Sequence, residues 1–353
     1  MADQRHKEAL KPGAVPIKRY QVRWGQLIVS PELGVLNGHT RQAATLCRGT
    51  PLKAVDSLVA GRLPEDTWKR HLKQRETALR NCYDELRSFE RAKLTLSKPT
   101  FFIPGWTAED AKTWFEEFSG SEEFYKPVEY WLDRIILNRD FAKRITLEKE
   151  SSESTDIFQF GEKLKRRLDR DAAGSELSLV GHSMGGLVSR AAVYCGEGDP
   201  LRVNNFITLG TPNRGAYIAQ LFNFKRFTKF FSRVVKSLTP QEVSQAQSMA
   251  MNSQDINRIN SLDCWKVISE RINNFLIFMG MKDLAVQNSP ELQLDEALKD
   301  ALRTKIRTYQ TSGAEHTGRH GITQDPRILL PVIKALCGME LKDNNNHGFM
   351  VCR

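Results

Sequence analysis

The sequence predicts an α/β protein with a mostly parallel sheet and helices on both of its faces. Short apolar segments alternate with helix-like segments from residue 99 to residue 338, which is typical of parallel sheets whose crossovers are helical. Several apolar segments end in glycine or proline, as strands do before a turn. Residues 177–186, LSLVGHSMGG, pass from an apolar run into a Gly-rich turn and then into a helix-like run.

The elements follow one another along the chain. We expect strands at 99–103, 144–147, 177–180, 205–209 and 274–279 because these runs are short and apolar or β-branched, and a further strand at 305–310, which alternates like an edge strand. We expect helices at 111–119, at 158–168 with one charged face, from residue 184, and at 326–336, where proline stands at the start.

Residues 1–98 do not continue the alternation and are expected to be a basic, partly helical extension. Within it, 20–30 could form a strand, and 65–91 has an apolar stripe at helical spacing. That stripe favours packing on the main domain over binding a partner. The predicted organisation is therefore an extension at 1–98, a main domain at 99–338 with a cap or lid insertion at 216–272, and a tail at 339–353.

Composition narrows the class of protein. The 353 residues are 40% hydrophobic. The sequence contains no run of about 18 apolar residues, the length that a helix needs to span a membrane. Residues 1–16 are polar and lack the apolar stretch of a secretory signal, so we expect a cytoplasmic location, with signal-independent export left open. The six cysteines are scattered without a CxxC motif, which predicts reduced thiols. We expect neither a metal ion nor an organic cofactor.

The net charge of +10 is unevenly distributed. Residues 1–100 hold 19 Lys and Arg against 10 Asp and Glu, whereas residues 101–353 hold 33 against 32. No aromatic interleaving or known module accompanies the basic residues, so we expect no nucleic-acid partner. A basic face attracted to an anionic membrane surface is the better hypothesis.

Residues 181–185 match GxSxG, the pattern of a nucleophile elbow. We expect Ser183 on a tight, strained turn between a strand and a helix, with Gly181 and Gly185 leaving room where larger side chains would clash. The helix after Ser183 would direct its N-terminal N–H groups at a developing oxyanion. The alternative is a Gly-rich turn with an idle serine.

A serine nucleophile needs a base and an acid, which are expected after later strands. Asp283 follows the apolar run 274–279, and Asp295 in a helix-like segment is the reserve candidate. His320 is the favoured base because the loop from it to the closing helix is short, and His316 is the alternative. His182, inside the elbow, is expected to serve packing.

Two backbone donors are needed for an oxyanion hole. The Met184 N–H, directly after the nucleophile, is the first candidate. The second is the Trp106 N–H at the end of the FFIPGW run, where Gly105 permits close backbone approach. The alternative for FFIPGW is a strand followed by an ordinary Pro-Gly turn.

Together, GHSMGGLVSR, the upstream FFIPGW and the downstream FITLGTPNRGA resemble the lipase and esterase branch of the α/β-hydrolase superfamily. The resemblance covers about residues 99–338. It implies the α/β-hydrolase fold, Ser183 as nucleophile, Asp283 as acid, His320 as base, and the Met184 and Trp106 amides as oxyanion donors. One departure is Asn213, where many relatives carry histidine.

The insertion contains a basic aromatic stretch at 222–238, FNFKRFTKFFSRVVKSL. Its apolar side chains fall on one helical face, which suits a cap lining an acyl pocket, a membrane-surface helix or a helix packed on the domain. We therefore expect a serine hydrolase of carboxylic esters with lipid-like acyl chains. The alternatives are a phospholipase or acyltransferase with the same triad, and a non-catalytic binding protein of the same fold.

Overall fold

The computed structural model describes most of the chain from residue 65 onward and two short strands before it. The described ranges are 20–22, 25–27, 65–105, 114, 123–145, 156–172, 174–195, 199–216, 247–250, 253–280, 302, 305–311, 314, 321–341 and 349–352. By its contacts the chain divides into two compact units, residues 1–73 and 74–353. In the first unit, β1 (Tyr20–Val22) and β2 (Gly25–Leu27) pair as an antiparallel hairpin. The expected single strand at 20–30 is thus a hairpin.

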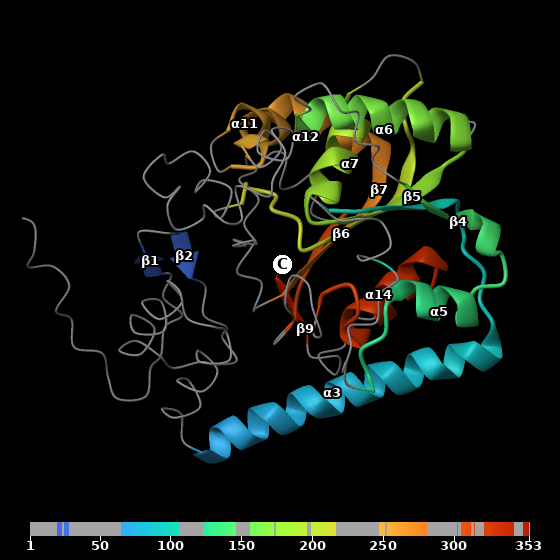
Figure 1. Ribbon diagram of the computed structural model, residues 1–353, viewed down its shortest axis with the longest axis vertical. Helices are drawn as coiled ribbons and strands as arrows, with labels where there is room; N and C mark the ends of the chain where they lie inside the picture. The colour runs from blue at the N-terminus through green and yellow to red at the C-terminus, as the bar shows by residue number, and fades with distance from the viewer. Residues whose placement is uncertain are drawn as a thin grey trace, which may run out of the picture. The chain divides into compact units, whose positions relative to one another are not determined.

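The second unit is built on a seven-stranded sheet in the order β4-β3-β5-β6-β7-β8-β9 (Figure 1). Its first six strands are parallel. Because their carboxyl ends share one edge of the sheet, loops from distant parts of the sequence meet there. The strands are β3 (Thr100–Ile103), β4 (Ala142–Arg144), β5 (Leu177–His182), β6 (Val203–Leu209), β7 (Ile272–Gly280), β8 (Ile306–Thr311) and β9 (Phe349–Cys352).

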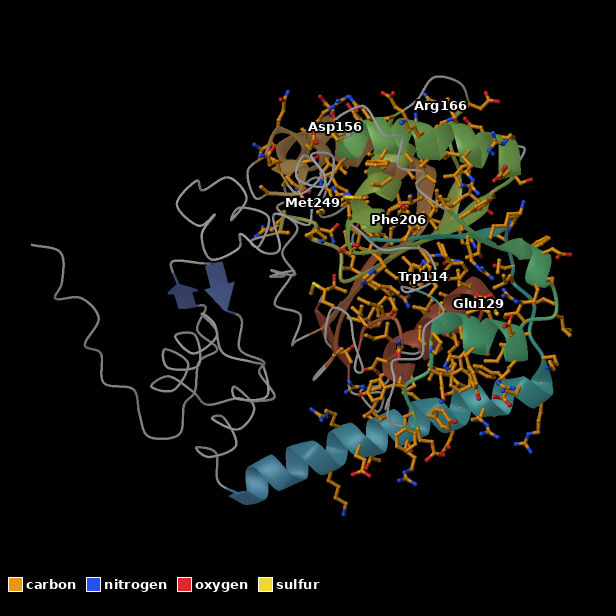
Figure 2. All side chains as sticks on the ribbon, in the orientation of Figure 1. Trp114, Glu129, Asp156, Arg166, Phe206 and Met249 are labelled. Atoms are coloured by element: carbon orange, nitrogen blue, oxygen red, sulfur yellow. The ribbon has the colours of Figure 1, made fainter. Side chains whose placement is uncertain are left out.

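Helices cover both faces of this sheet, which explains why β3 and β5 are buried along their whole length (Figure 1). One face carries α6 (Ile157–Ala172), α7 (Met184–Tyr194), α11 (Gln254–Ile259) and α12 (Leu262–Arg271). The other carries α5 (Val128–Ile135), α14 (Pro326–Leu336) and the C-terminal part of α3 (Glu65–Ala92). Phe206 and Trp114 belong to the two cores on opposite faces (Figure 2).

The part of the α3 stripe whose side chains the structure describes packs on the main domain, as the sequence favours. Its buried side chains share one core cluster with Phe102 of β3, Ile207 of β6 and the α14 side chains. The members of this cluster on α3 are Cys82, Tyr83, Leu86 and Phe89. Burying a side chain of this size contributes about 1.5–3 kcal/mol, so this half of the helix is held by tertiary packing rather than by helix propensity alone.

Most elements of the main domain occur where the sequence predicts them, but the expected edge strand is not at the edge of the sheet. The segment 305–310 was expected to alternate as an edge strand, but β9 pairs with β8 on its outer side in antiparallel register. Such pairing satisfies the outer backbone groups of β8. The expected strand at 144–147 is observed at Ala142–Arg144. The expected helix at 111–119 lies outside the described residues except for Trp114, which is helical.

Residues 254–271, which fall within the predicted insertion, form α11 and α12. Their buried side chains, including Ile256, Ile259 and Trp265, belong to the same core cluster as α6, α7 and β7. They therefore act as a helical crossover between the parallel strands β6 and β7. Residues 217–246, with the basic aromatic stretch, lie outside the described residues. In the part of the chain that the structure describes, no helix is both long and apolar enough to cross a membrane.

Candidate active site

Ser183 occupies the turn between β5 and α7 with φ 53° and ψ −125°. Among the described residues other than glycine, Lys93 is the one other with a positive φ. A backbone in such a sparsely populated region costs about 1–3 kcal/mol and persists where its surroundings fix it. The Ser183 N–H donates to the Leu209 carbonyl of β6 at 2.9 Å, and the Gly186 N–H donates to the Ser183 carbonyl at 3.2 Å. The predicted strained turn is confirmed.

Glycines make this turn possible by allowing backbones to approach. A Cβ on Gly181 would lie 2.6 Å from the Gly186 Cα, and one on Gly185 would lie 2.5 Å from the Ile103 carbonyl oxygen. Real Cβ atoms essentially never approach so closely. The expected role of Gly181 and Gly185 is confirmed, and Gly186 adds a third close approach, since its Cβ would overlap Thr211.

The structure describes one of the two expected oxyanion donors. Met184 is the first residue of α7, and N–H groups in the first turn of a helix have no intrahelical acceptor. The end of β3 lies beside the nucleophile, because a Cβ on Gly105 would be 2.8 Å from the Ser183 Cβ. Trp106, the residue after Gly105 and the second expected donor, lies outside the described residues.

The expected acid and base follow neighbouring strand ends. Strands β7 and β8 run parallel and end opposite each other at Gly280 and Thr311. Asp283, the reserve Asp295, His320 and the alternative His316 all lie outside the described residues. Since strands in a sheet are about 4.8 Å apart, the ends of β7 and β8 stand roughly 10 and 15 Å from the end of β5, across β6. Short loops can bridge such spans.

The turn directly after His320 is firmly anchored. The N–H groups of Gln324 and Asp325 donate to the Gly321 carbonyl at 2.9 and 3.1 Å. Asp325 caps α14 and forms a buried ion pair with Arg327, whose Nη2 lies 2.6 Å from the Asp325 Oδ2. Neighbouring Asp325 raises the pKa of Arg327 against the opposing effect of burial. The chain leaving His320 is therefore fixed on the main domain.

His182 serves packing, as expected. Its side chain is 3% exposed, and its ring meets the Trp114 ring edge-on at 6.2 Å between centroids. Trp114 in turn meets Phe102 of β3 at 5.5 Å. The role of Trp114 is not predictable from the sequence, because nothing in the segment 111–119 distinguishes it from an ordinary core residue.

Arg190, the last residue of GHSMGGLVSR, is fully buried, and its role is not predictable from the sequence either. Its Nη1 donates to the Asn213 Oδ1 at 3.2 Å, its Nη2 donates to the Ile259 carbonyl at 2.6 Å and the Asn260 Oδ1 at 3.1 Å, and its Cζ lies 4.3 Å from the centroid of the Trp265 ring. Burial lowers the pKa of Arg190 to about 10, so it remains charged at neutral pH. Among the described residues no carboxylate pairs with it.

This network gives Asn213, the departure from the related motif, a structural role. Asn213 accepts from Arg190 through its side chain and from the Asn260 Nδ2 through its carbonyl, at 2.8 Å. The loop after β6 is thereby tied to α7 and to the end of α11. Farther along, the Ala216 N–H donates to the Met249 carbonyl at 2.7 Å, and Ala216 and Ala250 form an isolated parallel bridge. The two chain segments that flank residues 217–246 thus lie side by side.

The sheet and the elbow give the chain the α/β-hydrolase fold. A serine in a strained turn between a buried strand and a helix, at the carboxyl edge of a parallel sheet covered on both faces, distinguishes this fold. The α/β-hydrolase fold that the sequence motifs imply is therefore confirmed.

Part of the chain matches a known protein family. The model of the PGAP1-like alpha/beta domain family matches residues 165–284, about a third of the chain, which include the elbow, β6 and β7. No curated protein matches the chain.

Several solved structures resemble the chain at low identity. The propeptide form of the lipase BlEst2 from Bacillus licheniformis is 17% identical with a TM-score of 0.42, over 72% of this chain and 52% of that one. The phospholipase PlaB from Legionella pneumophila is 14% identical with a TM-score of 0.43, over 72% and 61%. The carboxylesterase CesB from Bacillus subtilis is 13% identical with a TM-score of 0.38, over 75% and 100%. The chain thus spans about half of the lipase and three fifths of the phospholipase, and the fold assignment rests on the sheet, the elbow and the family match.

Proposed function

We propose that this protein is a serine hydrolase that cleaves carboxylic esters, with lipid-like acyl chains preferred. The observation that carries the proposal is the backbone of Ser183, which is held at φ 53° between β5 and the N-terminus of α7. An idle serine in a Gly-rich turn gives no reason to keep a strained conformation. A nucleophile does, because the turn presents its hydroxyl beside the positive end of a helix.

In the proposed mechanism Ser183 attacks the ester carbonyl while His320 takes its proton, and Asp283 orients the imidazole and stabilises the imidazolium. The Met184 and Trp106 N–H groups stabilise the oxyanion. The alcohol leaves with the proton from His320, and water then releases the acid from the acyl-enzyme. The end of β3 against Ser183 and the adjacent ends of β7 and β8 support this assignment of residues.

Labelling with a fluorophosphonate probe tests the nucleophile. We expect the wild type to be labelled and Ser183→Ala not to be. Ser189→Ala is the matched control, since the Ser189 hydroxyl lies in the same motif but donates to the Gly185 carbonyl at 2.7 Å and is fully buried. An unlabelled, folded wild type would leave the non-catalytic binding protein as the better account.

A panel of p-nitrophenyl esters of increasing chain length tests the substrate class. We expect kcat/KM to rise from acetate toward longer chains, because each buried CH₂ group contributes about 0.8 kcal/mol to binding. A sharp preference for acetate would contradict the lipid-like substrate. Product analysis with phospholipids and with alcohol acceptors separates hydrolysis of simple esters from phospholipase and acyltransferase activity.

The basic aromatic stretch at 222–238 supports the lipid-like preference and is proposed as a cap, with contact to an anionic membrane surface in a cytoplasmic setting. The bridge between Ala216 and Ala250 allows a clean deletion, because a short Gly-Ser linker can replace residues 217–246. We expect the deletion to reduce hydrolysis of long-chain esters more than that of acetate. Equal losses on both would count against the cap.

A further inference from the structure

Two consecutive residues of the elbow, His182 and Ser183, pack against the turn after β3, and His182 also packs against Trp114. Gly105, which ends the described part of β3 and its turn, lies against Ser183 and His182: its Cβ would be 2.8 Å from the Ser183 Cβ and 3.2 Å from the His182 Nδ1. Trp114 lies against the His182 ring. The residue after Ser183 is Met184, the first residue of α7, whose N–H is proposed above to donate to the oxyanion.

The Trp114 side chain spans two neighbouring strands at this edge of the sheet. It is 1% exposed and meets the rings of Phe102 in β3 and His182 in β5, both edge-on. Phe102 pairs in register with Val180, two residues before His182, so both rings project from the same face of the sheet. Figure 2 shows Trp114 close to the sheet on the side that carries α5 and α14.

Packing alone holds the indole within the described structure. The Trp114 Nε1 is buried and makes no hydrogen bond with any residue that the structure describes. Edge-on aromatic pairs contribute beyond the area they bury and favour particular ring orientations. The position of the Trp114 backbone is therefore coupled to the position of the elbow through His182.

We propose that Trp114, acting through His182, is a positioning residue for the nucleophile elbow, which carries Ser183 and the Met184 N–H. Its ring packs on the residue before the nucleophile, while Gly105 lies against the nucleophile itself. An oxyanion donor must lie about 2.7–3.1 Å from the developing charge, so a small shift of the elbow backbone weakens binding of the transition state more than binding of the substrate. The proposal rests on the proposed serine hydrolase activity and adds a residue to its machinery.

Substitution of two buried tryptophans tests this role. Trp131 is the matched control: it is fully buried, belongs to the same core cluster as Trp114, and contacts the rings of Tyr83 and Tyr130. In the full chain, Trp114→Leu and Trp131→Leu remove an indole from the same core, and Trp114→Phe and Trp131→Phe are the milder pair.

The first readout is the kinetics of hydrolysis of p-nitrophenyl esters. We expect Trp114→Leu to lower kcat by about tenfold or more with little change in KM, since displacement of a catalytic group by about 1 Å can cost 10²-fold. The affinity for a boronic acid that mimics the tetrahedral intermediate should fall by the same factor. Trp114→Phe should recover most of the loss, and the Trp131 variants should stay within about twofold of the wild type.

The second readout does not need activity. Hydrogen exchange of the peptide covering 177–190, followed by mass spectrometry, should be faster in Trp114→Phe than in Trp131→Phe at equal global stability. Equal exchange in both variants, or kcat losses that follow stability in both tryptophan series, would overturn the positioning role. An unlabelled wild type with faster elbow exchange in Trp114→Phe would instead overturn the proposed activity and retain the coupling.

Discussion

The elbow is held from two sides in different ways. On the β3 side, Gly185 and Gly105 bring backbones into close contact and Trp114 packs its ring on His182. On the β6 side, Thr211 packs on Gly186, and hydrogen bonds from the buried Arg190 hold Asn213. The β3 side is apolar and dominated by close backbone packing, whereas the β6 side uses a charged, hydrogen-bonded network.

The difference in packing between the β3 side and the β6 side agrees with the segments that follow each strand. The β3 side continues into the segment with the proposed oxyanion donor, where preorganised dipoles act most strongly if water is excluded. The β6 side leads to the paired segments around residues 217–246, and a guanidinium with several directed donors can hold such a loop in one orientation. Close packing fixes distance, while hydrogen bonds fix orientation.

The largest expected loss of stability comes from a side chain added against backbone atoms rather than against another side chain. Gly185→Ala places a methyl group against the Ile103 and Pro104 carbonyls, which belong to the backbone at the end of β3, whereas Gly186→Ala meets the Thr211 side chain. We expect Gly185→Ala to destabilise the protein by about 3 kcal/mol or more and Gly186→Ala by about 1–2 kcal/mol. Urea unfolding measures both.

Thr211→Ala is the partner for the second variant, because it removes both the hydroxyl oxygen and the methyl group that a Gly186 Cβ would overlap. We expect it to restore part of the loss in Gly186→Ala and none of the loss in Gly185→Ala. Equal losses in the two alanine variants would show that the two sides are packed alike.

The next effect concerns the charged network of the β6 side. Arg190→Lys retains the charge but cannot reach the acceptors on Asn213, Ile259 and Asn260 together. Leaving buried acceptors unpaired costs about 1–3 kcal/mol, so we expect a loss of about 2 kcal/mol in urea unfolding. Arg170→Lys, at a side chain that is 74% exposed, should change stability by less than about 0.5 kcal/mol. A similar small effect at Arg190 would contradict the role of its directed donors.

The smallest expected effect is a pH dependence of stability, which tests whether both faces of the sheet exclude water equally. Burial raises the pKa of Cys82, on α3, to about 12 and that of Cys264, on α12, to about 11. Because the unfolded chain ionises these thiols near their ordinary pKa while the folded chain does not, stability should fall as pH rises from about 9 toward 11.

Urea unfolding at pH 8 and pH 10 measures that slope. Cys82→Ala and Cys264→Ala should each reduce the difference between the two pH values. A slope that only one of the two variants reduces would indicate that one face is wetter than the other, and the two sides of the elbow would then differ in hydration as well as in packing.

Much of the fold is predictable because local pattern and tertiary role agree. β3, β5, β6 and β7 are buried between helices, so their sequences are short apolar runs that stand out. The start of α14 is set by Asp325 as N-cap and Pro326 at the first position. By contrast, β9 contains only the four residues FMVC, and nothing local indicates that they cover the outer side of β8.

The residues of the candidate site also fall into those that the sequence predicts and those that it does not. Ser183, Met184 and the two motif glycines are found from sequence because the elbow needs these residue types at fixed spacing. Asp283, His320 and Trp106 remain predictions from motif order. Trp114 and Arg190 carry no such signal, since a tryptophan or an arginine in a helix is ordinary until its neighbours are known.

The sequence alone determined that this protein has a parallel α/β sheet with a strained serine after a buried strand, because periodicity and glycine spacing are local properties of the chain. Only the tertiary structure decided what surrounds that serine: a ring from residue 114 on His182 and a buried guanidinium on Asn213. These contacts join residues that are 68 and 23 positions apart, and their energies depend on burial and orientation, which no local pattern encodes.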